Sequence, residues 1–252
     1  MTAALERWWG VLRSLAIYYG VPGRARRDRR LYRQFIQSGD LVYDIGAHVG
    51  NRTRVFLSLG ARCVAVEPQP HFAGLLRRIF AGNPGVTVVE AALGPEPGPG
   101  TLYISRRTPT VTTLSAGWME QVRRADSFAQ VRWEEAQQVT VTTLDVLIAV
   151  HGQPAFCKID VEGGELGVLQ GLSRPLAGLS FEYIPATMER TLACIRRLEE
   201  LAPYRYNWTV GEKQELRSQA WLTAEEMAAS LSRLSPNAPS GDVYARLQGR
   251  TY

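Results

Sequence analysis

The sequence contains few cysteines, almost no lysine and no long apolar run. Its three cysteines, Cys63, Cys157 and Cys194, form no CxxC pair, which is typical of a reduced cytoplasmic protein and not of a disulfide scaffold. No uninterrupted stretch of about 18 apolar residues is present, so we expect no membrane-spanning helix. Residues 1–20 are apolar, but charged residues interrupt the run and no small-residue cleavage site follows, which argues against a secretory signal.

Several motifs of known chemistry are also missing. The sequence has no HxxxH or other His/Cys spacing of a zinc site and no GxSxG nucleophile elbow. It has neither the dinucleotide fingerprint GxGxxG nor the phosphate-binding loop GxxxxGK[ST]. An aromatic–proline quartet such as NPPY, which would hold a flipped base, is absent as well. These absences disfavour a structural zinc protein, a serine hydrolase, an NAD enzyme and an ATPase.

Positive charge is concentrated at the N-terminus. The chain of 252 residues has 29 Lys+Arg against 24 Asp+Glu, a net charge of +5. Residues 1–30 hold seven arginines and two acids and therefore carry all of this net charge. Residues 31–252 have no net charge, which disfavours binding of a phosphate backbone by this part of the chain. Nucleic acid is therefore disfavoured as a partner.

The N-terminal segment itself has the pattern of a basic amphipathic helix. Its apolar positions recur at helical spacing over residues 5–19, and RARRDRR follows at 24–30. We therefore expect residues 1–30 to form a helical extension that docks on the protein's own body, on a second subunit of a homo-oligomer, or on an anionic membrane surface. The expected location is cytoplasmic, with peripheral membrane attachment as an option.

Apolar strands alternate with helical stretches through residues 31–252. We expect a single α/β domain in which a mostly parallel sheet is covered by helices on both faces. The Pro/Gly cluster at 94–100 predicts a loop, and the weakly patterned residues 106–138 predict a substrate loop or lid. The expected strands lie near 41–45, 62–67, 86–92, 101–105, 138–143, 155–160, 179–184, 204–210 and 242–247, and the main helices near 51–59, 70–81, 164–171, 187–202 and 223–234.

The loop after the first strand predicts a cofactor site. This strand ends in Asp44, and the loop and helix start that follow contain Gly46, His48, Gly50 and Thr53. Two glycines allow a tight turn and a close approach to a ligand, and the next helix offers free N–H groups. Glu67 ends the next strand, where an acid can accept both hydroxyls of a ribose. This combination fits a nucleoside with an amino-acid tail, namely S-adenosylmethionine.

A second group of residues predicts the reacting end of the site. Asp160 ends one buried strand, Glu162 follows it, and Glu182 lies near the end of the next strand. The carboxyl ends of parallel strands face the ligand crevice, so these acids should meet there. They can accept a proton from a hydroxyl nucleophile or hold a divalent cation such as Mg²⁺. Glu165 is expected instead to serve the start of the following helix.

Lys158 is notable because the chain contains 27 arginines and only two lysines. It lies two residues before Asp160, on the same face of the strand. It can neutralise the carboxylates or help activate the hydroxyl, or its stem can pack along apolar surface with the head in water.

Six segments together resemble the FkbM family of S-adenosylmethionine-dependent methyltransferases. They are LVYDIGAHVGNRT, VAVEPQP, VEAALG, VTTLDVLI, KIDVEGGE and FEYIP, in this order. The resemblance implies a Rossmann-like class I methyltransferase fold with seven strands, of which the seventh is antiparallel. It also implies that Ala91 and Ala92 lie at the adenine edge. His48 departs from the pattern, because the family more often has Asn there.

The resulting expectation is an O-methyltransferase acting on a hydroxyl of a sugar or a polyketide-type natural product. Asp160 is the first choice of base or cation ligand, supported by Glu162, Glu182 and Lys158. Two alternatives stay open: a nucleic-acid methyltransferase and a non-catalytic protein that binds the cofactor.

Overall fold

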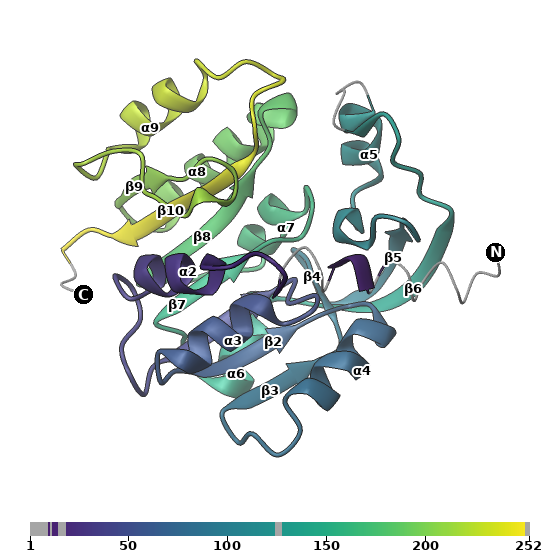
Figure 1. The fold of residues 1–252 in the computed structure, drawn as a ribbon. Helices are drawn as coiled ribbons and strands as arrows, with labels where there is room; N and C mark the ends of the chain where they lie inside the picture. The colour runs from purple at the N-terminus through teal and green to yellow at the C-terminus, as the bar shows by residue number, and fades with distance from the viewer. Residues whose placement is uncertain (1–9, 11, 15–18, 124–127, 250–252) are drawn as a thin grey trace.

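A seven-stranded sheet forms the centre of the protein, in a computed structural model that describes residues 10, 12–14, 19–123 and 128–249 (Figure 1). The strand order is β3-β2-β1-β7-β8-β10-β9, and β10 runs antiparallel to both of its neighbours, β8 and β9, while the other neighbouring pairs are parallel. The strands are β1 (Leu41–Ile45), β2 (Arg62–Val66), β3 (Val86–Val89), β7 (Phe156–Ile159), β8 (Gly178–Tyr183), β9 (Tyr204–Trp208) and β10 (Gly241–Leu247). This topology confirms the expected fold, including its antiparallel last strand.

The central strands form because their residues are apolar on both faces. All four residues of β7 are buried, as are the last four of β1, which is typical of a parallel strand covered on both sides. The register pairs Asp44 with Lys158 and Lys158 with Ser180, so β1, β7 and β8 end at the same edge. The expected site residues therefore meet at that edge.

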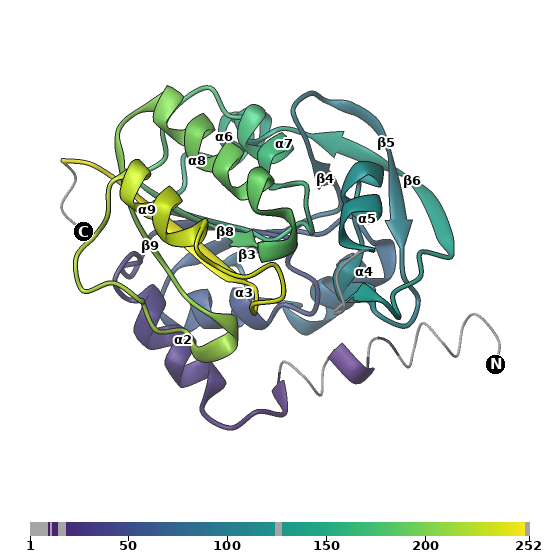
Figure 2. The same ribbon diagram turned by 90° about the horizontal axis from the view of Figure 1, so that it is seen from above.

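Helices cover both faces of the sheet (Figure 2). On one face lie α6 (Leu144–His151), α7 (Glu165–Gln170), α8 (Met188–Leu201) and α9 (Ala224–Leu231). On the other lie α2 (Arg24–Tyr32), α3 (Asn51–Ser58) and α4 (Pro70–Ile79). Apolar side chains from both groups pack against the strands and form two main core clusters.

A second, three-stranded sheet differs from the expectation for residues 86–105. Its strands are β4 (Ala92–Leu93), β5 (Gly98–Ile104) and β6 (Glu135–Thr142), in the order β4-β6-β5. The expected strand at 86–92 is thus split between two sheets, and the last three residues of the loop expected at 94–100 belong to β5 instead. Pro99 is tolerated in β5 because it is an edge strand of this sheet.

The segment expected as a substrate loop contains regular structure. It includes the short 3-10 helix η1 (Pro109–Val111) and α5 (Ala116–Val122), and its last residues already belong to β6. Trp118 of α5 is fully buried and packs edge-on against Phe128 and Trp133. These aromatic side chains therefore form a small core of their own beside the main sheet.

Only part of the expected N-terminal helix can be described. Residues 1–9, 11 and 15–18 lie outside the described residues, while Gly10, 12–14 and Tyr19 are helical. The Arg13 guanidinium donates a hydrogen bond to the Arg107 carbonyl (3.1 Å), and the Tyr19 hydroxyl donates one to the Val49 carbonyl (3.0 Å). These described residues thus contact the protein's own body.

The helix α2 runs across the expected boundary between residues 30 and 31. A buried ion pair between Asp28 and Arg52 joins it to α3. Across the described ranges, no helix has the length and apolar character needed to span a membrane.

Candidate functional site

Two glycines shape the loop between β1 and α3. Gly46 has φ 81°, and a Cβ atom there would lie 1.8 Å from the Asp160 carbonyl oxygen. Gly50 has φ 76°, and its Cβ would lie 2.8 Å from side-chain atoms of Leu76 and Phe80 in α4. Glycine is required at both positions, because the backbone is left-handed and the neighbours leave no room. The first glycine lets the loop pass directly beside the end of β7.

Asp44 and Thr53 lie at the two ends of this loop. Both are buried, and the Thr53 hydroxyl donates a hydrogen bond to the Asp44 carboxylate (2.6 Å). Burial raises the pKa of Asp44, although Lys158 and the Thr53 hydroxyl oppose the shift. Neither residue, nor Gly50, is among those that line the pocket described below. The hydrogen bond between Asp44 and Thr53 instead joins the end of β1 to the start of α3.

Glu67 closes the other side of the loop. Its carboxylate accepts hydrogen bonds from the backbone N–H groups of His48 and Gln69, each 2.9 Å long. Burial raises the pKa of Glu67 to about 7, because these two hydrogen bonds offset only part of the desolvation. The carboxylate keeps free lone pairs, since each of its oxygens can accept more than one bond.

His48 has a left-handed backbone, with φ 48°. Asn and His are both enriched in this conformation, which gives a physical reason why His can stand where the family more often has Asn. The ring packs against Phe72, with 4.1 Å between ring centroids. Burial lowers the pKa of His48 to about 3, so the imidazole is neutral at physiological pH.

A pocket opens at the carboxyl ends of β1, β2 and β7. It holds about 720 Å³ of empty space, a volume that includes the open solvent at its mouth. Of the residues expected from the sequence, it is lined by Gly46, His48, Glu67, Ala91, Ala92, Asp160 and Glu162. Sequence reasoning missed a further part of the lining: Gln69, Leu102, Pro109, Thr110, Thr112, Thr113 and Leu114.

The threonine-rich stretch at 108–113 is thus part of the pocket wall, not only of a lid. Its sequence, TPTVTT, contains no acid, glycine pair or other motif that would have identified it. Only the resulting fold brings η1 against the loop after β2.

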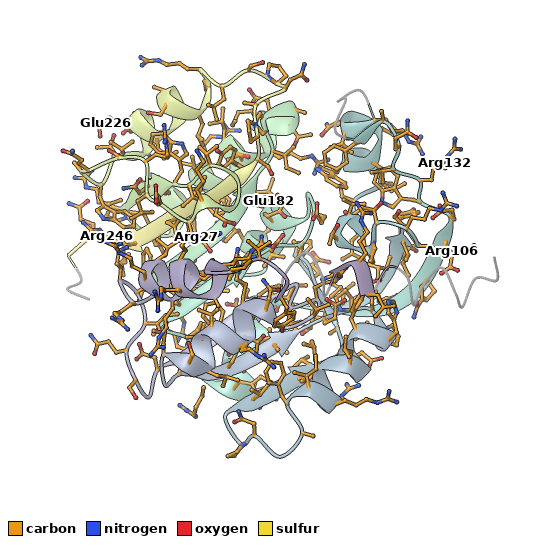
Figure 3. All side chains as sticks on the ribbon, viewed as in Figure 1. Arg27, Arg106, Arg132, Glu182, Glu226 and Arg246 are labelled. Atoms are coloured by element: carbon orange, nitrogen blue, oxygen red, sulfur yellow. The ribbon has the colours of Figure 1, made fainter. Side chains whose placement is uncertain are left out.

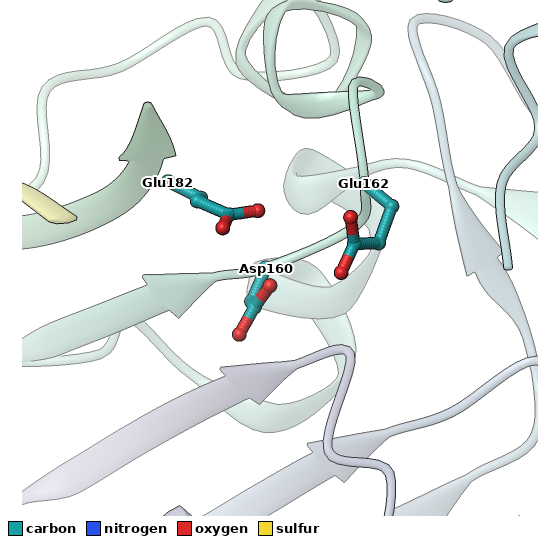
Figure 4. A group of neighbouring side chains, drawn as sticks. All are labelled: Asp160, Glu162 and Glu182. Carbon is teal, nitrogen blue, oxygen red and sulfur yellow. The ribbon is translucent and has the colours of Figure 1, made fainter. Parts of the chain in front are cut away.

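Three carboxylates meet beside the pocket (Figure 4). Asp160 and Glu162 follow β7 and Glu182 lies in β8, and one oxygen from each lies within 4.8 Å of the others. The Lys158 ammonium is buried and donates a hydrogen bond to the Asp160 carboxylate (2.5 Å). The expected meeting of these four side chains is therefore observed, and Lys158 neutralises Asp160 without reaching water.

The three acids differ in their electrostatic environment. Burial disfavours the charge of Asp160, but the Lys158 ammonium outweighs it and holds the pKa of Asp160 below its usual range. Burial, and then the neighbouring acids, raise the pKa values of Glu162 and Glu182 well above their usual range. Because like charges this close disfavour one another, the anionic form of Asp160 is favoured, and the protonated forms of Glu162 and Glu182 are favoured relative to free glutamates.

The backbone that carries Glu162 is held in an unusual conformation. Glu162 has φ 53° and Gly163 has φ 83°, and the Trp118 ring packs against Gly163 so closely that a Cβ there would lie 2.2 Å from it. Arg190 of α8 donates hydrogen bonds to the Gly163 carbonyl (3.0 Å) and to the Gln121 side chain (2.8 Å). Strain of this kind clusters at functional sites, and here α5 and α8 sustain it.

Glu165 has the structural role expected for it. It is the first residue of α7, and its carboxylate accepts hydrogen bonds from the backbone N–H groups of Val161 and Gly163, both 3.2 Å long. Burial raises the pKa of Glu165 to about 7. It therefore braces the loop that carries Glu162.

One family model and one relative match parts of the sequence. Residues 44–198, more than half of the chain, match the model of the methyltransferase FkbM domain. A segment of 55 residues is 36% identical to the chloroplastic ribosomal RNA small subunit methyltransferase of Arabidopsis thaliana, a match that covers 22% of this chain and 16% of that relative.

Two solved structures are similar in shape at low identity. One is the O-methyltransferase from Bacillus cereus in complex with SAH, with 14% identity, coverage of 95% of this chain and 90% of that chain, and a TM-score of 0.44. The other is a TehB-like SAM-dependent methyltransferase from Corynebacterium glutamicum, with 10% identity, coverage of 88% of each chain and a TM-score of 0.46. By the family match over its central residues, the chain belongs to the FkbM methyltransferase domain family.

Proposed function

We propose that this protein is an S-adenosylmethionine-dependent methyltransferase whose acceptor is a hydroxyl group. The observation that supports it most is the pocket in which Glu67 and the Gly46 loop lie on one side and the carboxylate cluster on the other. The first side could bind the nucleoside part of the cofactor, and the acids would then lie near its reactive methyl group. The family membership supports the same cofactor.

The residues around the pocket fit this cofactor. Glu67 would accept hydrogen bonds from the ribose hydroxyls through its free lone pairs, and Ala91 and Ala92 offer an apolar edge for the adenine. When bound, S-adenosylmethionine supplies a methyl group on a positively charged sulfur. The anionic Asp160 lines the pocket and would favour that positive charge.

Proton removal from the acceptor is the task proposed for the carboxylates. Asp160 is held anionic by Lys158, which suits it for orienting the hydroxyl and for electrostatic support more than for accepting a proton. Glu162 lines the pocket, and its raised pKa makes its carboxylate, when ionised, a stronger base than a free glutamate. We therefore assign the role of accepting the hydroxyl proton to the Glu162 carboxylate, with the Glu182 side chain beside it.

A sugar or a polyketide-type natural product is the proposed acceptor class. Methyl transfer to a panel of sugars, hydroxylated polyketides and RNA tests it, with the release of S-adenosylhomocysteine as the readout. Turnover with a hydroxylated small molecule is the expected result. Cofactor binding without turnover on any acceptor would favour the non-catalytic alternative.

RNA is the second candidate acceptor, because one segment resembles a ribosomal RNA methyltransferase. Residues 31–252 have no net charge, which weakens this candidate. Methylation of RNA but of no small molecule in the same panel would establish it instead.

A divalent cation is a further proposal for the carboxylate cluster. Three oxygens within 4.8 Å of one another form a donor set of the type that Mg²⁺ prefers. A bound cation would favour the ionised forms of Glu162 and Glu182 and so oppose the rise in their pKa values. Loss of activity in EDTA, restored by Mg²⁺, would support the cation.

A further inference from the structure

The outward face of α2 is almost entirely arginine. Its inward residues, among them Asp28, Leu31 and Tyr32, are buried against the body. The exposed positions on and directly after the helix include Arg26, Arg27, Arg29, Arg30 and Arg33. Within the part of the chain that the structure describes, none of these five arginines forms an ion pair. Figure 3 labels one of them, Arg27, on this helix.

Exposed apolar side chains precede this helix. Leu12 is 56% exposed, Val21 47% and Tyr19 37%, and they account for three of the five large apolar side chains exposed among the described residues. The described helical turn at 12–14 and α2 lie on the same side of the molecule (Figure 2). The bonds from Arg13 to Arg107 and from Tyr19 to Val49 attach this segment to the body, so its outward groups are held in place.

We propose that this surface, formed by the five arginines of α2 with Leu12, Tyr19 and Val21, binds an anionic lipid membrane. Unpaired arginines attract acidic headgroups, and each basic residue near such a surface contributes about a fivefold increase in binding. Exposed apolar side chains beside them enter the boundary between headgroups and acyl chains. A nucleic acid would use the arginines, and its bases can stack on Tyr19, but it would leave the aliphatic side chains of Leu12 and Val21 without a partner.

Neutrality elsewhere in the chain supports this choice of partner. Residues 1–30 carry all of the net positive charge and residues 31–252 carry none, so attraction to an anionic surface would turn the α2 side of the molecule toward the membrane. The proposal does not depend on methyl transfer, and its test can fail while the proposed function holds.

Co-sedimentation with lipid vesicles tests the proposal on the full chain. Binding to vesicles of phosphatidylcholine with about one third phosphatidylglycerol is expected, together with little binding to pure phosphatidylcholine and a steep loss at high salt. A variant with Arg26→Gln, Arg27→Gln, Arg29→Gln and Arg30→Gln should bind at least tenfold more weakly. Its thermal stability should be unchanged because these side chains are exposed.

A matched control removes the same charge elsewhere. The variant with Arg78→Gln, Arg174→Gln, Arg196→Gln and Arg233→Gln changes four exposed arginines of other helices and loops and should bind vesicles like the original protein. Leu12→Gln with Val21→Gln should weaken vesicle binding severalfold without affecting binding to a single-stranded RNA oligomer.

Four results would overturn the proposal, of which three concern binding. These three are equal binding to neutral and anionic vesicles, equal loss in the control variant, and tighter binding to RNA that ignores the Leu12 and Val21 substitutions. A stable dimer that binds no vesicles would overturn it as well.

Discussion

Among single residues, four titratable side chains determine the chemistry of the site: Lys158, Asp160, Glu162 and Glu182. Lys158 is buried and bound to Asp160, so it fixes which of the acids is anionic. The sequence alone predicted that these residues meet, because they end neighbouring parallel strands. It could not assign their protonation, which depends on burial and on distances that only the folded chain defines.

Substitution of Glu162 should separate proton transfer from cofactor binding. Glu162→Gln preserves the size of the side chain but removes its capacity to accept a proton, so turnover should fall about 100-fold. Affinity for S-adenosylhomocysteine should stay within about twofold, measured by calorimetry. The exposed Glu120→Gln in α5 is the control and should keep full turnover.

Asp160→Asn should also cut turnover about 100-fold, because its negative charge orients the hydroxyl or holds a cation. Lys158 then loses its partner, so the melting temperature must be compared with that of the unmodified chain. Full activity in a folded Asp160→Asn variant, and in EDTA, would remove Asp160 and the cation from the mechanism together.

Because of Glu165, the stability of the folded protein should depend on pH. Its pKa is about 7 in the folded protein and lies near 4.5 when unfolded, so the folded state binds more protons between these values. Stability contributed by this group is therefore lost as pH rises from about 4.5 to about 7, by up to about 3 kcal/mol. Glu165→Gln can keep both backbone hydrogen bonds through its amide oxygen, and should reduce this loss between pH 5 and pH 8.

Urea denaturation at both pH values measures this change. Glu67 has the same direction of shift and should leave part of the slope in place. The exposed Glu96→Gln serves as control. An unchanged slope in Glu165→Gln would contradict the assignment.

At the scale of elements, the sequence predicted the central sheet well and the smaller sheet poorly. Strands such as β1 and β7 are continuous apolar runs, a signal that depends little on context. By contrast β5 begins with Gly98, Pro99 and Gly100, which indicate a turn when read locally. Pairing with β6, a tertiary effect, makes these residues a strand.

The packing of α5 is expected to control the position of Glu162. Trp118 of α5 packs against Gly163, and Arg190 bonds to Gly163 and Gln121, so α5 and α8 hold the loop together. Arg190→Met should therefore lower kcat or raise the acceptor KM about tenfold, since hydrogen bonds from a charged group are lost. Cofactor affinity should not change.

The control for this prediction lies on the same helix. Arg196→Met changes an exposed arginine of α8 and should leave the kinetics as they were, while Arg190→Lys should restore part of the loss. A uniform loss of cofactor affinity and acceptor turnover in Arg190→Met would mean that the residue only stabilises the fold.

At the scale of the whole molecule, the fold explains why distant motifs work together. Parallel strands β1, β2, β7 and β8 end at one edge, so Gly46, Glu67, Asp160 and Glu182 gather there from across the sequence. This much follows from strand order, and the sequence motifs suffice to predict it. The sequence predicted a substrate loop at 106–138 but not that Thr110, Thr112 and Thr113 form its part of the wall, because this depends on how one irregular loop packs.

Titration calorimetry with S-adenosylmethionine tests whether the pocket binds this cofactor through Glu67. The unmodified chain should bind the cofactor, and Glu67→Ala should weaken binding by about 1–3 kcal/mol, or roughly 5- to 150-fold, because ribose hydroxyls lose their acceptor. Glu90→Ala, which changes a half-exposed acid paired with Arg77 after β3, should bind like the original. Absence of binding by the unmodified chain, or unchanged affinity in a folded Glu67→Ala variant, would contradict the account.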